Sequence, residues 1–150
     1  MTNFPLGTYT VHRVGFGAMQ LPGPGVFGPP RDHEQAIAVL RRAVELGVDH
    51  IDTSQFYGPN VANELIREAF HPYSDKLALV SKVGARRDDK GGWFPYGQPD
   101  ELRAAIEENL RTLDLDTLAA VNLRIHNSED PSNPAPIDRE LLDGQLSAMI

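Results

Sequence analysis

Apolar and polar positions along the chain follow two periods that alternate over most of its length. Spacing typical of strands covers residues 8–13, 14–19, 48–52, 77–83 and 118–125. Spacing typical of helices covers residues 32–46, 61–70 and 99–113 and a last segment from about residue 137. The first strand pattern predicts one arm of an N-terminal β-hairpin. The rest predicts four strand–helix units with strands about 30 residues apart, which is typical of βαβ units and a parallel sheet.

The predicted helices carry clear end signals. Asp32 suits an N-cap, Gln35 three residues later completes a capping-box pattern, and Gly47 stands where a left-handed C-terminal residue is expected. Pro99 suits the first position of the third helix, whose apolar face comprises Leu102, Ile106, Leu110 and Leu113.

Two architectures fit this order of elements. A doubly wound parallel sheet suits a length of 150 residues. A (β/α)8 barrel needs about 250 residues, so four units would form half of one. The sequence reaches Ile150 inside an apolar helical pattern, without a Gly, Pro or polar cap. This pattern indicates an interrupted sequence.

Charge and composition narrow the classes of partner. The net charge of −7 argues against nucleic acid or an anionic membrane surface as the main partner, because both are negatively charged and bind positively charged proteins. There is no apolar run near the roughly 20 residues that span a bilayer, and the N-terminal sequence lacks a signal-peptide pattern. The chain has no cysteine, which excludes disulfides and suits the cytosol. We therefore expect a cytoplasmic domain.

A glycine-rich loop resembles a dinucleotide-binding fingerprint. Residues 23–28, GPGVFG, match G-x-G-x-x-G, and Asp49 or Asp52 lies about 20 residues further on. However, Pro29-Pro30-Arg31 separate the loop from the Asp32 cap, and prolines offer no N–H to a pyrophosphate. The pattern favours an ordinary Pro/Gly loop.

Titratable side chains follow the predicted strands at one end of the sheet. Asp52 ends the 48–52 strand, Lys82 lies near the end of the next, and the fourth runs into His126; Tyr57 lies in the loop after Asp52. Each alone has an ordinary structural explanation, but together they suit carbonyl reduction. A lysine ammonium stabilises a developing tyrosinate, an aspartate holds the lysine, and a neutral imidazole orients the carbonyl oxygen.

These segments resemble the aldo-keto reductases. The resemblance rests on Gly15-Phe16-Gly17, GVDHIDTSQFYG with Asp52 and Tyr57, LVSKVG with Lys82 and VNLRIH with His126, in the family's order. It implies a (β/α)8 barrel that reduces aldehydes or ketones with NADPH. Tyr57 would donate the proton, assisted by Lys82, Asp52 and His126.

The resemblance also implies cofactor contacts. It places Gly17, Ala18, Met19 and Asp52 near the nicotinamide and its ribose. Asn127, just after His126, is a further candidate for contact with the substrate or the nicotinamide amide. The family's later strands, which bind the rest of the cofactor, would lie beyond Ile150, so NADH stays open as an alternative. We expect residues 1–150 to be the N-terminal half of a barrel that needs the rest of its polypeptide, a complementing half or an oligomer.

Aromatic residues suggest a wall for the substrate. Trp93 lies in a loop expected over residues 84–98, and Phe27 and Phe56 are further candidates; an ordinary surface loop is the alternative. No group of His, Asp and Glu has metal-ligand spacing.

Two other functions remain open on sequence grounds. One is a non-catalytic binding or regulatory half-barrel, or an inactive fragment. The other is a Rossmann-type dehydrogenase in which Asp52 binds ribose, which leaves Lys82 and His126 unexplained.

Overall fold

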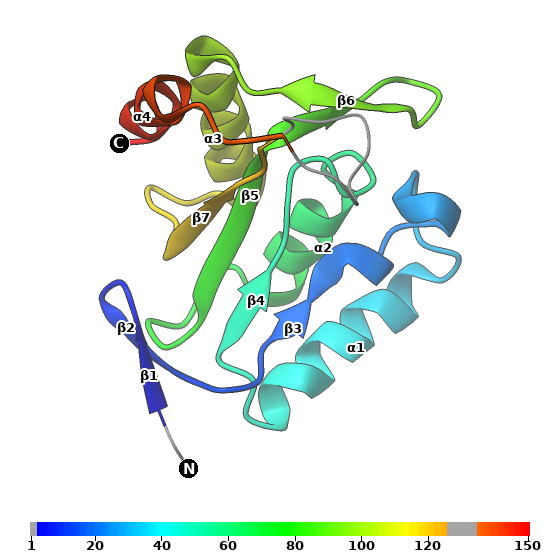
Figure 1. Cartoon of the computed structure of the whole chain (residues 1–150). Helices are drawn as coiled ribbons and strands as arrows, with labels where there is room; N and C mark the ends of the chain where they lie inside the picture. The colour runs from blue at the N-terminus through cyan, green and yellow to red at the C-terminus, as the bar shows by residue number, and fades with distance from the viewer. Residues whose placement is uncertain (1–2, 126–134) are drawn as a thin grey trace.

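The computed structural model describes residues 3–125 and 135–150, which form an α/β fold (Figure 1). The strands are β1 (Asn3–Leu6), β2 (Tyr9–His12), β3 (Phe16–Gly17), β4 (His50–Asp52), β5 (Ala78–Arg87), β6 (Trp93–Tyr96) and β7 (Ala120–Leu123). The helices are α1 (His33–Glu45), α2 (Val61–Phe70), α3 (Pro99–Leu113) and α4 (Arg139–Ser147), with short 3-10 helices η1 (Ala18–Gln20) and η2 (Pro24–Val26).

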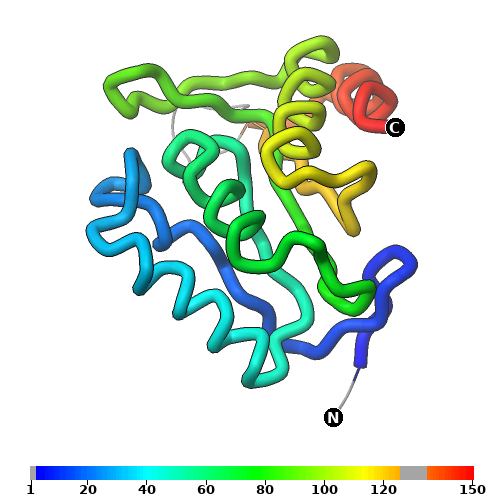
Figure 2. The backbone as a smooth tube through the Cα atoms, turned by 180° about the vertical axis from the view of Figure 1, so that it is seen from behind, coloured from blue at the N-terminus to red at the C-terminus, as the bar shows by residue number. Residues whose placement is uncertain are grey.

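The main sheet is wound in one direction. Its parallel strands lie in the chain order β3, β4, β5 and β7, and β6 pairs antiparallel with β5. Seen from behind, α1, α2 and α3 lie side by side over the same face of this sheet (Figure 2). A doubly wound sheet reverses its strand order and carries helices on both faces. The arrangement is therefore that of consecutive units of a (β/α)8 barrel.

The apolar core lies between the sheet and these three helices. Ile51 and Leu79 point outward from β4 and β5 and pack with Leu40 of α1, Leu65 of α2 and Leu113 of α3. Each of these side chains is at most 3% exposed. Full burial of one such side chain contributes about 1.5–3 kcal/mol. The opposite faces of β4 and β5, which carry Asp52 and Lys82, are more open.

Helix ends agree closely with the end signals in the sequence. The Asp32 carboxylate accepts a hydrogen bond from the backbone N–H of Gln35, and Gly47 has φ +97° after the end of α1. Gln98 and Glu101 form the capping box of α3, with Pro99 at the helix start. The last helix starts at Arg139, two residues after the predicted position.

The strand predicted over residues 14–19 is shorter than expected. Only Phe16 and Gly17 pair with β4, the chain then turns into η1, and Val14 is 71% exposed rather than buried. Because β4 itself has only three residues, the ladder that could order this segment is short.

The segment predicted as a loop over residues 84–98 is instead a β-hairpin. β5 continues to Arg87, and Trp93–Tyr96 pairs with it antiparallel. The Asp88 carboxylate accepts hydrogen bonds from the backbone N–H groups of Lys90 and Gly92 and so shapes the turn. Gly84 marks the residue at which β5 leaves β7 for β6. It has φ +99°, and a Cβ there would lie 2.3 Å from the Arg124 carbonyl oxygen.

The N-terminal hairpin was predicted and is confirmed. β1 and β2 pair antiparallel and lie beyond the end of the sheet at which the parallel strands begin (Figure 1). Asp49, just before β4, holds the hairpin against the sheet. Its carboxylate accepts a hydrogen bond from the backbone N–H of His12, at 3.0 Å, and lies 2.8 Å from the imidazole Nδ1 of the same residue. The hairpin therefore covers the end of the sheet opposite to Lys82.

Candidate active site

Asp52 and Lys82 meet on the inner face of the sheet. They lie on the neighbouring strands β4 and β5, near the ends at which parallel strands present ligand sites. The Lys82 ammonium lies 2.5 Å from Asp52 Oδ2 and also donates to the backbone carbonyl of Thr53, at 3.2 Å. The side chain of Lys82 is 19% exposed and that of Asp52 39%. The pair therefore places a fixed cation on a surface that solvent and ligands can reach.

Tyr57 lies against the same ammonium. The Lys82 Nζ atom lies 4.9 Å from the centroid of the Tyr57 ring. The Tyr57 ring is buried, at 4% exposure, and packs edge-on against Phe56. Among the residues that the structure describes, the Tyr57 hydroxyl forms no hydrogen bond. Three of the four side chains predicted to act together, Asp52, Tyr57 and Lys82, are thus brought together.

The fourth predicted residue, His126, lies outside the described residues, as does Asn127. β7 ends at Leu123 and pairs with β5 so that Asn122 lies opposite Lys82. The roles of His126 and Asn127 stay predictions.

The predicted cofactor residues lie at the end of β3, beside this cluster. Gly17 pairs with Asp52 across the β3–β4 ladder. A Cβ at Gly17 would meet nothing within 4 Å, so the space above its backbone is open. Ala18 is fully buried, whereas Met19 is 41% exposed.

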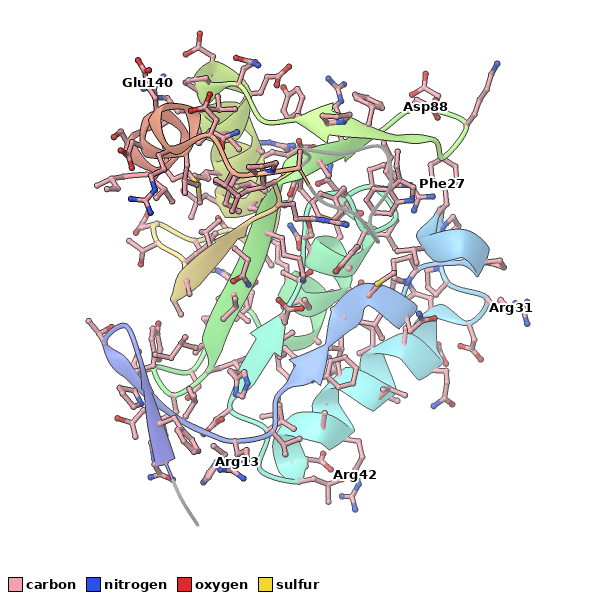
Figure 3. The ribbon with its side chains drawn as sticks, in the orientation of Figure 1. Arg13, Phe27, Arg31, Arg42, Asp88 and Glu140 are labelled. Atoms are coloured by element: carbon pink, nitrogen blue, oxygen red, sulfur yellow. The ribbon has the colours of Figure 1, made fainter. Side chains whose placement is uncertain are left out.

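The three predicted substrate-binding aromatics form one cluster. Trp93 packs edge-on against Phe56, with ring centroids 5.3 Å apart, and is 44% exposed. Phe27 lies between the η2 loop and the β5–β6 hairpin whose tip carries Asp88 (Figure 3). Phe56 is 2% exposed and supports Trp93 and Tyr57 from beneath, so Trp93 offers the accessible ring.

Arg87 joins the loops of this aromatic cluster, although it was not among the predicted site residues. Its guanidinium lies 5.3 Å from the Phe27 ring centroid and 4.4 Å from that of Trp93. It donates to the backbone carbonyls of Gly25, Val26 and Gly91. The sequence shows only an arginine pair at 86–87, and which member turns inward depends on the strand register that the hairpin creates.

Arg124 is a second cation on this rim that the sequence analysis missed. It lies just after β7, with its guanidinium 5.8 Å from the Phe56 ring centroid and 5.7 Å from that of Trp93.

Within residues 3–125 and 135–150, no helix is long and apolar enough to cross a membrane. The same part of the chain contains no cluster of three metal-ligating His, Cys, Asp or Glu residues.

Comparison with known proteins identifies the family of this chain. The sequence model of the aldo/keto reductase family matches residues 13–143. The chain belongs to the aldo/keto reductase family. This membership settles the architecture in favour of the (β/α)8 barrel and against a doubly wound or Rossmann-type sheet.

Individual relatives show how much of the family's fold the chain covers. Pyridoxine 4-dehydrogenase from Escherichia coli is 61% identical over 122 residues, which are 81% of this chain and 43% of that protein. The holo form of an aldo-keto reductase from Bacillus halodurans superposes with a TM-score of 0.75 at 24% identity, over 99% of this chain and 45% of the other. An aldo-keto reductase from Klebsiella pneumoniae in complex with NADPH gives 0.68 at 24% identity, over 99% and 45%. The last two show the fold alone. The chain spans about half the length of these reductases.

Proposed function

We propose that the protein reduces an aldehyde or ketone to an alcohol, with Tyr57 as the proton donor and NADPH as the reductant. The observation that carries this proposal is the position of the Lys82 ammonium, which contacts both the Asp52 carboxylate and the Tyr57 ring. A tyrosine at a carbonyl-reducing site must release its proton in the transition state, and an adjacent fixed cation favours that release.

Each residue of the cluster has a distinct part in this proposal. When bound, NADPH supplies the hydride for the carbonyl carbon. The Tyr57 hydroxyl donates its proton to the carbonyl oxygen and becomes a tyrosinate. Lys82 stabilises that negative charge, and Asp52 holds the ammonium in place. His126 would hydrogen-bond the carbonyl oxygen and orient it toward the Tyr57 hydroxyl.

The cofactor proposal rests on the surface beside Asp52. Gly17 leaves room for the nicotinamide, and Met19 and Asp52 border it. Asn127 would bind its amide. The K. pneumoniae reductase that shares this fold is in complex with NADPH. We therefore propose NADPH ahead of NADH.

For the substrate, we propose an aldehyde on a flat aromatic ring, of the pyridoxine class. The E. coli relative, at 61% identity, is a pyridoxine 4-dehydrogenase. Trp93 provides an accessible aromatic face beside the cluster, on which a pyridine ring can stack. Reduction of pyridoxal, the 4-aldehyde of that class, gives pyridoxine.

We also propose that residues 1–150 form the first half of the barrel. Its described parallel strands are four of the eight that the fold requires, and the relatives are about twice as long. The second half would come from further polypeptide, a complementing chain or an oligomer. The cytoplasmic location remains a prediction from composition.

An assay on the purified intact protein tests the proposed reaction. Pyridoxal and NADPH should yield pyridoxine, with a higher kcat/KM than for an aliphatic aldehyde that lacks a ring. A Trp93→Leu variant should lose this preference and keep the cofactor affinity. Equal kcat/KM values for the two aldehydes would contradict the substrate class. Cofactor binding without turnover of any aldehyde would favour a binding module, and absence of binding an inactive fragment.

A further inference from the structure

Three of the four residues between Asp52 and Tyr57 have buried polar side chains. Thr53 and Ser54 have no exposed surface, and Gln55 is 4% exposed. A loop beside a ligand site more often exposes such residues to water. Thr53 donates to Asn63 of α2, and Gln55 accepts from Asn109 of α3. The helices behind the sheet are therefore coupled to the loop that carries Tyr57.

Asn109, in the interior of α3, is the centre of this hydrogen-bond network. It is fully buried and uses every donor and acceptor of its amide. The Nδ2 group donates to Gln55 Oε1, at 2.8 Å, and to the backbone carbonyl of Ala105, at 2.8 Å. The Oδ1 atom accepts from Ser81 Oγ, at 2.6 Å, and from Asn63 Nδ2, at 3.0 Å. A flipped amide would place its oxygen against the Ala105 carbonyl oxygen and its N–H groups against those of Asn63, so the orientation of Asn109 is fixed.

Two of these bonds end next to the catalytic side chains. Gln55 lies two residues before Tyr57, and Ser81 lies immediately before Lys82 on β5. Ser54 adds a direct link between the two segments, because its hydroxyl lies within hydrogen-bond distance, 3.1 Å, of the Lys82 backbone carbonyl. One buried amide therefore ties both the Tyr57 loop and the Lys82 strand to α3.

We propose that Asn109 is a positioning residue that holds Tyr57 and Lys82 in register for proton transfer. Asn109 is fully buried within the fold, so it would act through Gln55 and Ser81. This inference rests on the proposed function of Tyr57. A displacement of about 1 Å between reacting groups reduces a rate by about 100-fold, so a small slip of the loop against β5 is enough to matter.

Thr112 offers a matched control in the same helix. Its hydroxyl accepts from Asn63 Nδ2 and donates to the Glu108 carbonyl, and within the described residues it forms no hydrogen bond with Gln55 or Ser81. A Thr112→Val variant should lower the melting temperature without changing kcat. It separates loss of stability from loss of positioning.

The test compares kcat and KM in the intact protein. Asn109→Ala should lower kcat by about 10- to 100-fold, while the KM for the aldehyde and the Kd for NADPH change less than about threefold. Ser81→Ala removes only the hydrogen bond from Ser81 to Asn109 and should lower kcat by a smaller factor. Ser81→Thr keeps the hydroxyl and should retain the wild-type kcat. If Asn109→Ala fails to fold, the comparison of Ser81→Ala with Ser81→Thr tests the positioning role.

Each result has a distinct meaning when Tyr57→Phe is assayed alongside. Full kcat in both Asn109→Ala and Ser81→Ala, with a lowered melting temperature, would overturn the positioning role. Loss of kcat in Tyr57→Phe at the same time would leave the proposed function intact. Full kcat in Tyr57→Phe would instead overturn the proposed function itself.

Discussion

The Lys82 ammonium is hydrogen-bonded to the Asp52 carboxylate across two neighbouring strands, at 2.5 Å. The same ammonium lies over the ring of Tyr57. A cation held between a carboxylate and a phenol on an open sheet face is the central feature of the proposed active site.

Removal of the Asp52 charge should slow proton transfer. In Asp52→Asn, the ammonium loses its counter-charge and keeps the Thr53 carbonyl as its acceptor. We expect kcat to fall by about 10- to 100-fold in steady-state assays of the intact protein. Asp100→Asn, which changes a fully exposed carboxylate paired with Arg103, is the control and should have no effect. An unchanged kcat in Asp52→Asn would show that the pair is structural only.

Arg87 should matter for the substrate wall, and its neighbour should not. Arg87→Met leaves the carbonyls of Gly25, Val26 and Gly91 without this donor, which should cost about 1–3 kcal/mol of unfolding free energy. Because the loops around Trp93 then loosen, the KM for the aldehyde should rise.

The adjacent Arg86 is the matched control for that variant. It lies on the other face of β5, exposed, over the Tyr96 ring. Denaturant unfolding and KM measurements on Arg86→Met should give values close to wild type. Equal losses in the two variants would refute the specific role of Arg87.

Asp49 should make the hairpin attachment sensitive to acid. Burial alone would raise the pKa of Asp49, but hydrogen bonds from the His12 backbone and the His50 ring, with the charges of both imidazoles, bring that pKa below its ordinary 3.8. A lowered folded-state pKa stabilises the fold above the unfolded value, and this contribution disappears as the pH falls through the folded value.

The unfolding free energy should therefore fall more steeply with acid in wild type than in Asp49→Asn, between about pH 5 and pH 3. Asp75→Asn, at an exposed carboxylate of the same end of the fold, should retain the steep fall. Parallel curves for wild type and Asp49→Asn would contradict this account of the attachment.

Tyr73 should make the fold sensitive to alkali. Burial raises the pKa of Tyr73 from 10.0 to about 12, and its hydroxyl donates to the Leu113 carbonyl, at 2.6 Å. A raised folded-state pKa means that the neutral phenol is favoured in the fold. The stabilisation is complete below about pH 10 and is lost as the pH rises toward 12.

Tyr73→Phe should remove that alkaline dependence and, through the lost hydrogen bond, lower the unfolding free energy by about 1 kcal/mol at neutral pH. Urea unfolding at a series of pH values measures both effects. A Tyr73→Phe protein that still loses stability between pH 10 and 12 as wild type does would place the titrating group elsewhere.

The features that could be predicted from the sequence are the helix ends and the residues at the ends of parallel strands. The helix caps at Asp32 and Pro99 depend on neighbours within a few residues, so their signals are local. Asp52 and Lys82 were found because parallel strands bring their carboxyl ends to one rim, whatever the details of packing.

The features that were missed depend on register and tertiary burial. The β5–β6 hairpin arises because β5 continues past Gly84, which has no side chain to clash with the Arg124 carbonyl. Asn109 lies on the buried face of α3, among apolar residues. A single polar residue in a helix pattern does not indicate in the sequence that its side chain is buried. Its role appears only when Gln55 and Ser81 approach from other elements.

The most direct test of the central claim is Tyr57→Phe in the intact protein. Quenching of the fluorescence of Trp93, the single tryptophan of residues 1–150, measures NADPH binding, and NADPH consumption with pyridoxal measures turnover. We predict that the cofactor Kd stays close to wild type while kcat falls by at least about 100-fold, because the phenol that donates the proton is gone. Carbonyl reduction at the wild-type rate in Tyr57→Phe would contradict the account.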